Sequence, residues 1–266
     1  MRPWLPAPST FATFPDIEPC RPEPPVPASR DERPRKPVLI VLHQEHSTPG
    51  RIGRLLRLLG HDLDIRRPRF GDPLPETLEQ HAGAVVFGGP MSANDPDAFI
   101  KAEIDWLDVP LKESVPLIGI CLGAQMLAMK LGQPVVFHPA ARVEMGYYRV
   151  VPTSAAAAVA AAPFPTWVYH WHSEGFQLPH GADCLAVGED FACQAFAYGD
   201  AAFGLQFHPE VTYAMICRWT VRGAARLALP NAAPPHSHKE DWFLHDAVVA
   251  RWTGAFLAAW LRRGRA

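Results

Sequence analysis

Hydrophobic runs alternate with helical patterns through the first half of the chain. Short apolar runs that suit buried strands stand at 37–43, 62–67, 82–90 and 115–120. Apolar residues at helical spacing fall between and after them, at 51–59, at roughly 97–113 and from Cys121 to Gly132. This alternation predicts an α/β fold with a mostly parallel central sheet flanked by helices.

The second half of the chain has a different pattern. Shorter β-like runs, which we expect hairpins to join in part, occur at 134–137, 147–151, 166–170, 184–187, 193–198 and 203–208. They predict an additional antiparallel β portion. The alanine-rich stretch 154–162 predicts a short surface helix. Aromatic and aliphatic residues between Glu240 and Arg263 predict an amphipathic helix that packs on the domain.

Proline marks off the N-terminus. Eleven of the 29 prolines lie within the first 37 residues, and proline blocks the interiors of both helices and sheets. We therefore expect 1–36 to be an extended, mostly disordered arm and 37–266 to be one folded domain.

Composition excludes several classes of protein. The net charge of −2 does not suit a nucleic-acid partner. No apolar run is long enough to cross a bilayer, so no membrane partner is expected. Five cysteines without a CxxC pair argue against a disulfide scaffold or a thiolate zinc site, and a cytoplasmic location is the default expectation. We predict no metal and no cofactor.

The segment GICLGAQ carries the first chemical signal. It has the form G-x-C-x-G at a predicted strand-to-helix junction, which is the spacing of a nucleophile elbow with cysteine in place of serine. The positive end of the following helix would favour the thiolate of Cys121. The Leu122 N–H lies in the first helical turn, so it is free to meet an oxyanion.

A candidate base follows a later strand, in LQFHPEV. Pro209 favours an extended conformation at His208, and residues i and i+2 of an extended segment point to the same side. Glu210 can therefore orient the imidazole of His208, which completes a Cys, His, Glu triad in chain order. A glycine pair, Gly88-Gly89, ends the strand at 82–90, where the Gly89 N–H is a candidate second oxyanion donor.

These three motifs together, GICLGAQ, LQFHPEV and VVFGGPMSANDPD (85–97), strongly resemble the class I, triad-type glutamine amidotransferases. The chain is most similar to the stand-alone proteins that resemble the amidotransferase domain of GMP synthase. The resemblance covers about 37–266 and implies a flavodoxin-like sheet. It makes Cys121 the nucleophile, His208 the general base and acid, and Glu210 the third member of the triad.

The resemblance also implies a glutamine pocket. Gln125 lies one helical turn after Cys121 and would contact bound glutamine. The segment VYHWHSEGF (168–176) would form a wall of the pocket. Four residues of this segment and the first glycine of the pair join Gln125 in the predicted substrate-binding set. The set is Gly88, Gln125, His172, Ser173, Gly175 and Phe176.

Two histidine-rich segments invite a metal interpretation. His170 and His172 alternate along a predicted strand and could both be ligands, but no acidic or cysteine cluster accompanies them in the sequence. The segment HQEHSTPG (43–50) contains His43, Glu45 and His46, and we interpret it as a loop near the site without a catalytic role. Aromatic strand packing remains the alternative for His170 and His172.

The chain contains no phosphate-binding SGG or GxxxxGK pattern, so it encodes no ATP-using module and is not a full GMP synthase. We predict hydrolysis or transfer at the γ-glutamyl amide of glutamine or of a γ-glutamyl compound, through a cysteine thioester. A separate synthase subunit that accepts ammonia is a candidate partner. Two alternatives stay open: a γ-glutamyl peptidase or transferase that acts on glutathione-like compounds, and a glutamine-binding regulatory subunit without catalysis.

Overall fold

The computed structural model describes residues 35–264, and the predicted arm lies outside the described residues except for its last two. Arg35 and Lys36 lie against the folded domain, where each donates a side-chain hydrogen bond to a backbone carbonyl, of Leu59 and Glu79 respectively.

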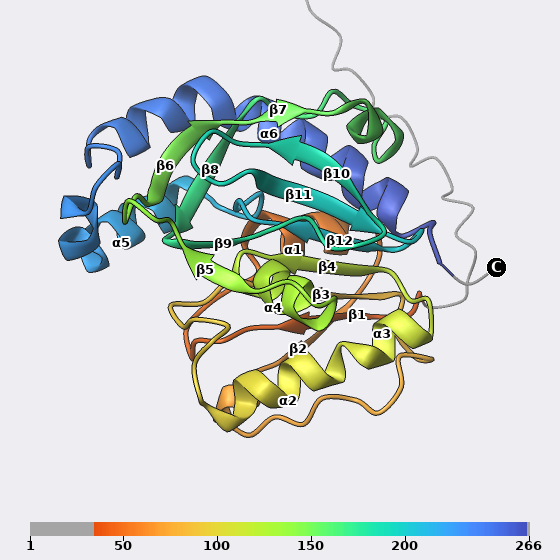
Figure 1. The fold of residues 1–266 in the computed structure, drawn as a ribbon. Coiled ribbons are helices and arrows are strands. Elements are labelled where there is room, and N and C mark those ends of the chain that lie inside the picture. The colour runs from red at the N-terminus through yellow and green to blue at the C-terminus, as the bar shows by residue number, and fades with distance from the viewer. Residues whose placement is uncertain (1–34, 265–266) are drawn as a thin grey trace, which may run out of the picture. The chain divides into compact units, whose positions relative to one another are not determined.

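A central sheet organises the domain (Figure 1). Within 35–264 its eight strands stand in the order β2-β1-β3-β4-β12-β11-β10-β7. Five neighbouring strands are parallel: β2 (Leu63–Arg66), β1 (Val38–Val41), β3 (Gly83–Val86), β4 (Leu117–Ile120) and β12 (Ala202–Leu205). Three antiparallel strands extend them: β11 (Cys193–Tyr198), β10 (Ala182–Val187) and β7 (Val151–Pro152). The predicted mostly parallel sheet with an antiparallel portion is confirmed.

Two small antiparallel sheets lie beside the central one. They pair β5 (Val135–Phe137) with β9 (Glu174–Phe176), and β6 (Glu144–Arg149) with β8 (Trp167–His172). The short strand β9 was not predicted, because the β-like run predicted at 166–170 ends before it.

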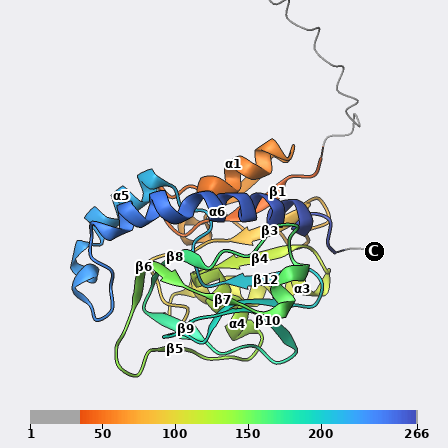
Figure 2. The same ribbon diagram turned by 90° about the horizontal axis from the view of Figure 1, so that it is seen from above.

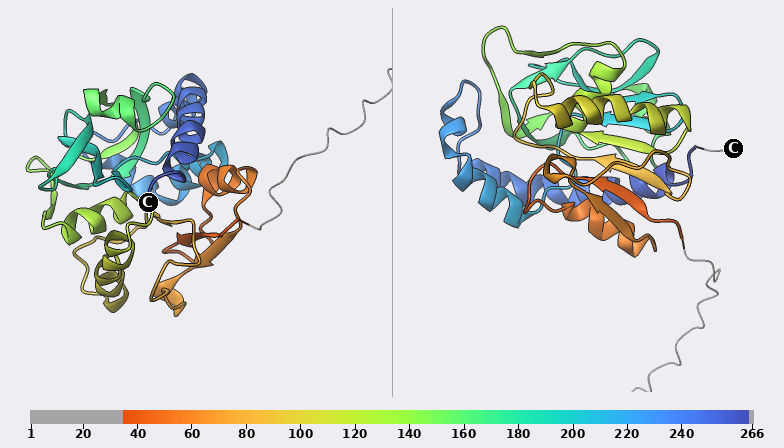
Figure 3. Two further views of the ribbon diagram at one scale, coloured as in Figure 1. Left: turned by 90° about the vertical axis from the view of Figure 1, so that its right-hand side faces the viewer. Right: turned by 90° about the horizontal axis from the view of Figure 1, so that it is seen from below.

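Helices cover both faces of the sheet (Figure 3, left). One face packs against α1 (Gly50–Leu58) and α6 (Ser237–Trp260), and Figure 2 shows α6 running along the molecule beside α1 and α5. The other face packs against α2 (Ala98–Trp106) and α4 (Leu122–Lys130). Side chains alternate between these two cores along β1, as they must in a strand: Val38 and Ile40 face α1 and α6, and Leu39 and Val41 face the other way.

The predicted C-terminal helix is confirmed by α6, which buries Trp252, Phe256 and Trp260. The single helix predicted over 97–113 is wrong, because the chain forms α2 and then the short α3 (Asp108–Lys112). Pro110 has no N–H to donate to the Trp106 carbonyl, so a continuous helix loses a bond there.

Two further elements differ from prediction. The alanine-rich segment forms a 3₁₀ helix over Ser154–Ala158 instead of a helix through 162, because few of its side chains are buried to hold a longer one. The helix α5 (Tyr213–Arg222) was not predicted, although Thr212 caps it by accepting a hydrogen bond from the Met215 N–H. No helix in 35–264 combines the length and the apolarity that a bilayer crossing requires.

Candidate active site

The residue Cys121 lies between β4 and α4, in a backbone conformation that is typical of a sharp turn. Its φ of 49° and ψ of −105° are unusual for a residue with a side chain. Such a conformation costs on the order of 1–3 kcal/mol and persists only where the surroundings enforce it. Parallel strands flank β4 on both sides, the Cys121 N–H donates to the Leu205 carbonyl at 2.8 Å, and the Cys121 carbonyl accepts from the Gln125 N–H at 2.9 Å.

The flanking glycines of the motif are required by packing. A Cβ on Gly119 would lie 2.5 Å from the carbonyl oxygen of Gly123, and a Cβ on Gly123 would lie 2.2 Å from that of Val86. No side chain fits at either position without moving backbone. The G-x-C-x-G spacing therefore follows from the close approach of β3, β4 and α4 at this turn.

His208 follows β12, the strand beside the one that ends at Cys121. Its N–H donates to the Tyr169 carbonyl at 2.8 Å, and its Nδ1 lies 2.8 Å from Oε1 of Glu210. Both side chains are buried. Because an ionised carboxylate only accepts, Nδ1 carries the hydrogen, and Nε2 is left without a hydrogen-bond partner among the described residues. The same-side contact predicted for His208 and Glu210 is present.

The thiol and the imidazole meet at Gly88. A Cβ on this glycine would lie 2.9 Å from Cε1 of His208 and 3.3 Å from Cβ of Cys121. Burial acts to lower the pKa of His208, but the negative charges of Glu210 and of the Cys121 thiolate outweigh it and raise that pKa to about 10. The imidazole therefore holds its second proton at neutral pH, where it can pair with a thiolate.

Two backbone N–H groups lie beside this pair. The Leu122 N–H opens α4, where first-turn amides lack a partner within the helix. The Gly89 N–H makes no hydrogen bond within the described part of the chain. A Cβ on Gly89 would lie 3.2 Å from Cδ2 of Leu122, so the two segments are adjacent.

The comparisons with known proteins point to one family. A model of the family described as "Glutamine amidotransferase class-I" matches residues 43–215, which is well over half of the chain. The chain belongs to this family.

Relatives among curated proteins include the glutamine amidotransferase-like protein YfeJ of Salmonella typhimurium, which is 30% identical over 66% of this chain and 76% of its own length. The GMP synthase of Anaplasma marginale is 31% identical over 62% of this chain, but the match spans only 32% of that longer protein.

Solved structures support the same fold. A glutamine amidotransferase from Methylobacillus flagellatus superposes with a TM-score of 0.81 at 27% identity, over 87% of this chain and 96% of that one. Another from Thermotoga maritima gives 0.77 at 30% identity, over 85% and 97%.

In this amidotransferase-like domain, Gln125 is tied to the protein itself. Its Nε2 donates to the Glu174 carbonyl at 3.0 Å and to Oε1 of Gln206 at 3.3 Å, and the side chain is buried. The sequence-based prediction gave its amide to the substrate. In the structure both amide hydrogens bond to protein groups, the Glu174 carbonyl in β9 and Gln206 just after β12, and the amide oxygen is left for a ligand.

The predicted pocket wall is also built into the packing. Phe176 is buried against Phe196, and a Cβ on Gly175 would collide with the ring of Phe191. His172 is buried as well. Ser173 is only partly buried, and its Oγ accepts from Arg226 at 3.5 Å. Any contact of this wall with substrate would fall to Ser173 or to backbone groups.

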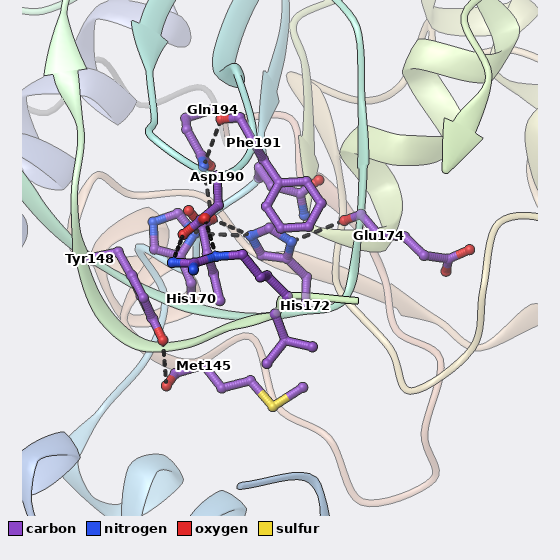
Figure 4. Close-up of polar contacts among 12 residues, drawn as sticks. Met145, Tyr148, His170, His172, Glu174, Asp190, Phe191 and Gln194 are labelled. Carbon is purple, nitrogen blue, oxygen red and sulfur yellow. Dashed lines mark hydrogen bonds and ion pairs between the residues drawn. The ribbon is translucent and has the colours of Figure 1, made fainter. Parts of the chain in front are cut away.

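His170 and His172 do have an acidic neighbour, Glu144, contrary to expectation. Figure 4 shows the two histidines, with a hydrogen bond from His172 to Glu174. In the register of β6 and β8, Glu144 stands directly opposite His172. Ligand atoms of all three residues lie within 4.8 Å of one another, an arrangement that could hold a metal ion. The sequence could not show this, because Glu144 and His172 are distant along the chain.

Hydrogen bonds and ion pairs connect these residues, although Nε2 of buried His170 has no hydrogen-bond partner among the described residues. His172 donates from Nδ1 to the Glu174 carbonyl at 2.9 Å, and its Nε2 lies 2.9 Å from Oε2 of Glu144. Gln194 donates to the same carboxylate oxygen at 2.8 Å. Burial acts to raise the pKa of Glu144, but His170, His172 and Gln194 outweigh it and lower that pKa to about 2. The cluster thus braces the Glu174 carbonyl that also holds Gln125.

Sequence reasoning missed two charged residues near the site. The Glu174 carboxylate accepts from Oγ of Ser92 at 3.0 Å, which joins β9 to the loop after the glycine pair. Burial lowers the pKa of Arg226, while the charges of Cys121 and Glu174 act to raise it. Arg226 lies in a 3₁₀ helix (Ala224–Ala228) that no motif marks, so the sequence offers no signal for it.

Proposed function

We propose that this class-I amidotransferase domain cleaves the γ-amide of glutamine or of a γ-glutamyl compound through a thioester on Cys121. The observation that carries the proposal is the buried His208–Glu210 pair beside a cysteine held at positive φ. In that setting the imidazolium can stabilise negative charge on the Cys121 sulfur as it attacks.

The chemistry follows from these positions. The Cys121 thiolate attacks the side-chain carbonyl carbon, and the N–H groups of Gly89 and Leu122 stabilise the resulting oxyanion. His208 donates its proton to the leaving nitrogen, and ammonia or an amine departs. Water, deprotonated by the now neutral imidazole, then releases the γ-glutamyl group. The base typically supplies ~10²–10⁴-fold in rate and one oxyanion donor ~10²–10³-fold.

The fate of the ammonia defines the partner. We propose that a separate synthase protein receives it, because the chain matches about a third of the length of the GMP synthases among its relatives. One relative, from Ignicoccus hospitalis, is named as one of the subunits of a GMP synthase, and the match covers 82% of that protein. Glutamine is then the substrate, and hydrolysis in the absence of the partner is the basal reaction.

The test is turnover by the purified chain. Glutamine and a panel of γ-glutamyl amines and peptides are incubated with the wild type, with Cys121→Ala and with Cys217→Ala, which removes a partly exposed thiol in α5. We expect Cys217→Ala to match the wild type and Cys121→Ala to lose at least ~10³-fold. A loss below about tenfold in folded Cys121→Ala would exclude thiol catalysis.

The panel also separates the alternatives. Release of amines from γ-glutamyl peptides at higher kcat/KM than ammonia from glutamine would favour the peptidase or transferase. Binding of glutamine without any turnover would favour the regulatory subunit. A glutamine-analogue electrophile should label Cys121 ahead of the other cysteines, and equal labelling of all would contradict an activated thiolate.

A further inference from the structure

His43 is a fully buried histidine two residues after the end of β1, next to the glycine pair that follows β3. Its Nε2 lies 2.7 Å from Oε2 of Glu103, a buried carboxylate in α2. Its Nδ1 lies 3.2 Å from the carbonyl oxygen of Gly88. The neighbouring side chains Glu45 and His46 are instead 71% and 81% exposed. The loop predicted from HQEHSTPG therefore contains one residue of a different kind.

The direction of the hydrogen bond to Gly88 does not depend on which group holds the proton shared by His43 and Glu103. A carbonyl only accepts, so Nδ1 of His43 donates to Gly88. Between Nε2 and Glu103 the proton can reside on either partner, and Nδ1 remains the donor in both cases. Oε1 of Glu103 has no other hydrogen-bond partner in the described part of the chain. Among the described residues, the carboxylate of Glu103 therefore hydrogen-bonds only to His43.

The Gly88 carbonyl and the Gly89 N–H belong to one peptide unit. A trans peptide is planar, with its C=O and N–H pointing in opposite directions. Fixing the carbonyl toward His43 therefore fixes the N–H away from it. Glycine on both sides leaves this peptide few steric reasons to keep one orientation, so the hydrogen bond from His43 is what selects it.

We propose that His43, held by Glu103, is a positioning residue that orients the Gly89 N–H toward the oxyanion. The inference rests on the proposed function, because it assigns a role to an amide that acts only in that reaction. His43 itself does not touch the reacting atoms, since both of its ring nitrogens are engaged elsewhere. Its contribution is to the preorganisation of the donor.

A pair of substitutions separates the two hydrogen bonds of His43. The amide nitrogen of asparagine can take the place of Nδ1, so His43→Asn keeps a donor for the Gly88 carbonyl and loses the hydrogen bond to Glu103. The longer side chain in His43→Gln reaches the place of Nε2, so this variant keeps the hydrogen bond to Glu103 and loses the one to the Gly88 carbonyl. We expect His43→Gln to lower kcat ~10–10²-fold with KM for glutamine unchanged, which is at or below the cost of deleting an oxyanion donor. The loss in His43→Asn should be several times smaller.

Alkylation of Cys121 by iodoacetamide supplies a readout that a merely structural role would not produce. That displacement forms no oxyanion, so its rate in His43→Gln should equal the wild-type rate while amide cleavage falls. His46→Gln, in the same loop and exposed, is the matched control and should change neither rate. Glu103→Gln, which keeps the shape of the carboxylate, should lower kcat less than His43→Gln does.

The outcomes are distinct from those that test the proposed function. A wild type that cleaves no γ-glutamyl amide refutes the proposed function. With an active wild type, a kcat for His43→Gln within about twofold of it, or equal losses in amide cleavage and alkylation, overturns the inference. A crystal structure of His43→Gln decides independently of activity: a Gly88–Gly89 peptide in the wild-type orientation overturns it, and a turned or mixed peptide supports it.

Discussion

Replacing Glu210 with glutamine tests the electrostatic part of the triad. The carboxylate lies 2.8 Å from Nδ1 of His208, and both groups are buried. Glutamine can still accept that hydrogen bond, so the substitution removes the charge and leaves the shape. Two unit charges about 4 Å apart attract by ~4 kcal/mol at an effective dielectric constant of ~20. That energy corresponds to a ~10³-fold weaker hold of His208 on its proton.

The sign of the pH effect follows from the charged state. In the proposed reaction, the imidazolium must keep its proton to pair with the Cys121 thiolate and to protonate the leaving nitrogen. In the wild type it loses that proton only near its raised pKa of about 10. In Glu210→Gln the alkaline fall in activity should therefore move to lower pH.

The assay follows thioester formation under pre-steady-state conditions across pH, with His208→Ala as the comparison. We expect His208→Ala to lose ~10²–10⁴-fold and Glu210→Gln to lose less at neutral pH. If the alkaline fall in activity of Glu210→Gln occurs at the same pH as in the wild type, the electrostatic argument is refuted. Equal losses in both variants at every pH would give Glu210 a direct part in proton transfer.

Three other predictions concern stability. Gly123→Ala should destabilise the fold by more than ~2 kcal/mol in urea unfolding, because its Cβ would lie 2.2 Å from the Val86 carbonyl, whereas the control Gly254→Ala in α6 has room and should not. Glu144→Gln should lower the free energy of unfolding by up to ~3 kcal/mol at neutral pH. This deficit should shrink as pH falls from 4.5 toward 2, because the depressed pKa of the carboxylate stabilises the fold fully above this range and progressively less within it. A deficit that does not change with pH would contradict this reasoning. Removal of residues 1–34, which retains the Arg35 contact, should leave Tm and turnover unchanged.

Motif spacing was sufficient to predict the elbow and the His208–Glu210 contact, because both depend on residues close in sequence. Contacts that depend on strand pairing were not predictable in the same way. Glu144 reaches the H-x-H segment only through the register of β6 with β8. His43 lies in a polar, turn-rich segment that reads as exposed, but in the structure it is buried between Glu103 of α2 and the Gly88 carbonyl. Gln125 was assigned to the substrate because its position on the helix face was visible and its protein partners were not.

The place of β4 in the sheet has a consequence for biosynthesis. Its neighbours are β3, made earlier, and β12, which the ribosome adds only after about eighty further residues. Pairing across so long a separation is slow relative to local folding. Until β12 docks, Cys121 lacks both the strand that holds its strained turn and the neighbouring imidazole of His208. In a nascent or partly folded chain the proposed nucleophile therefore lacks its partner, and the candidate site is assembled only when the sheet closes.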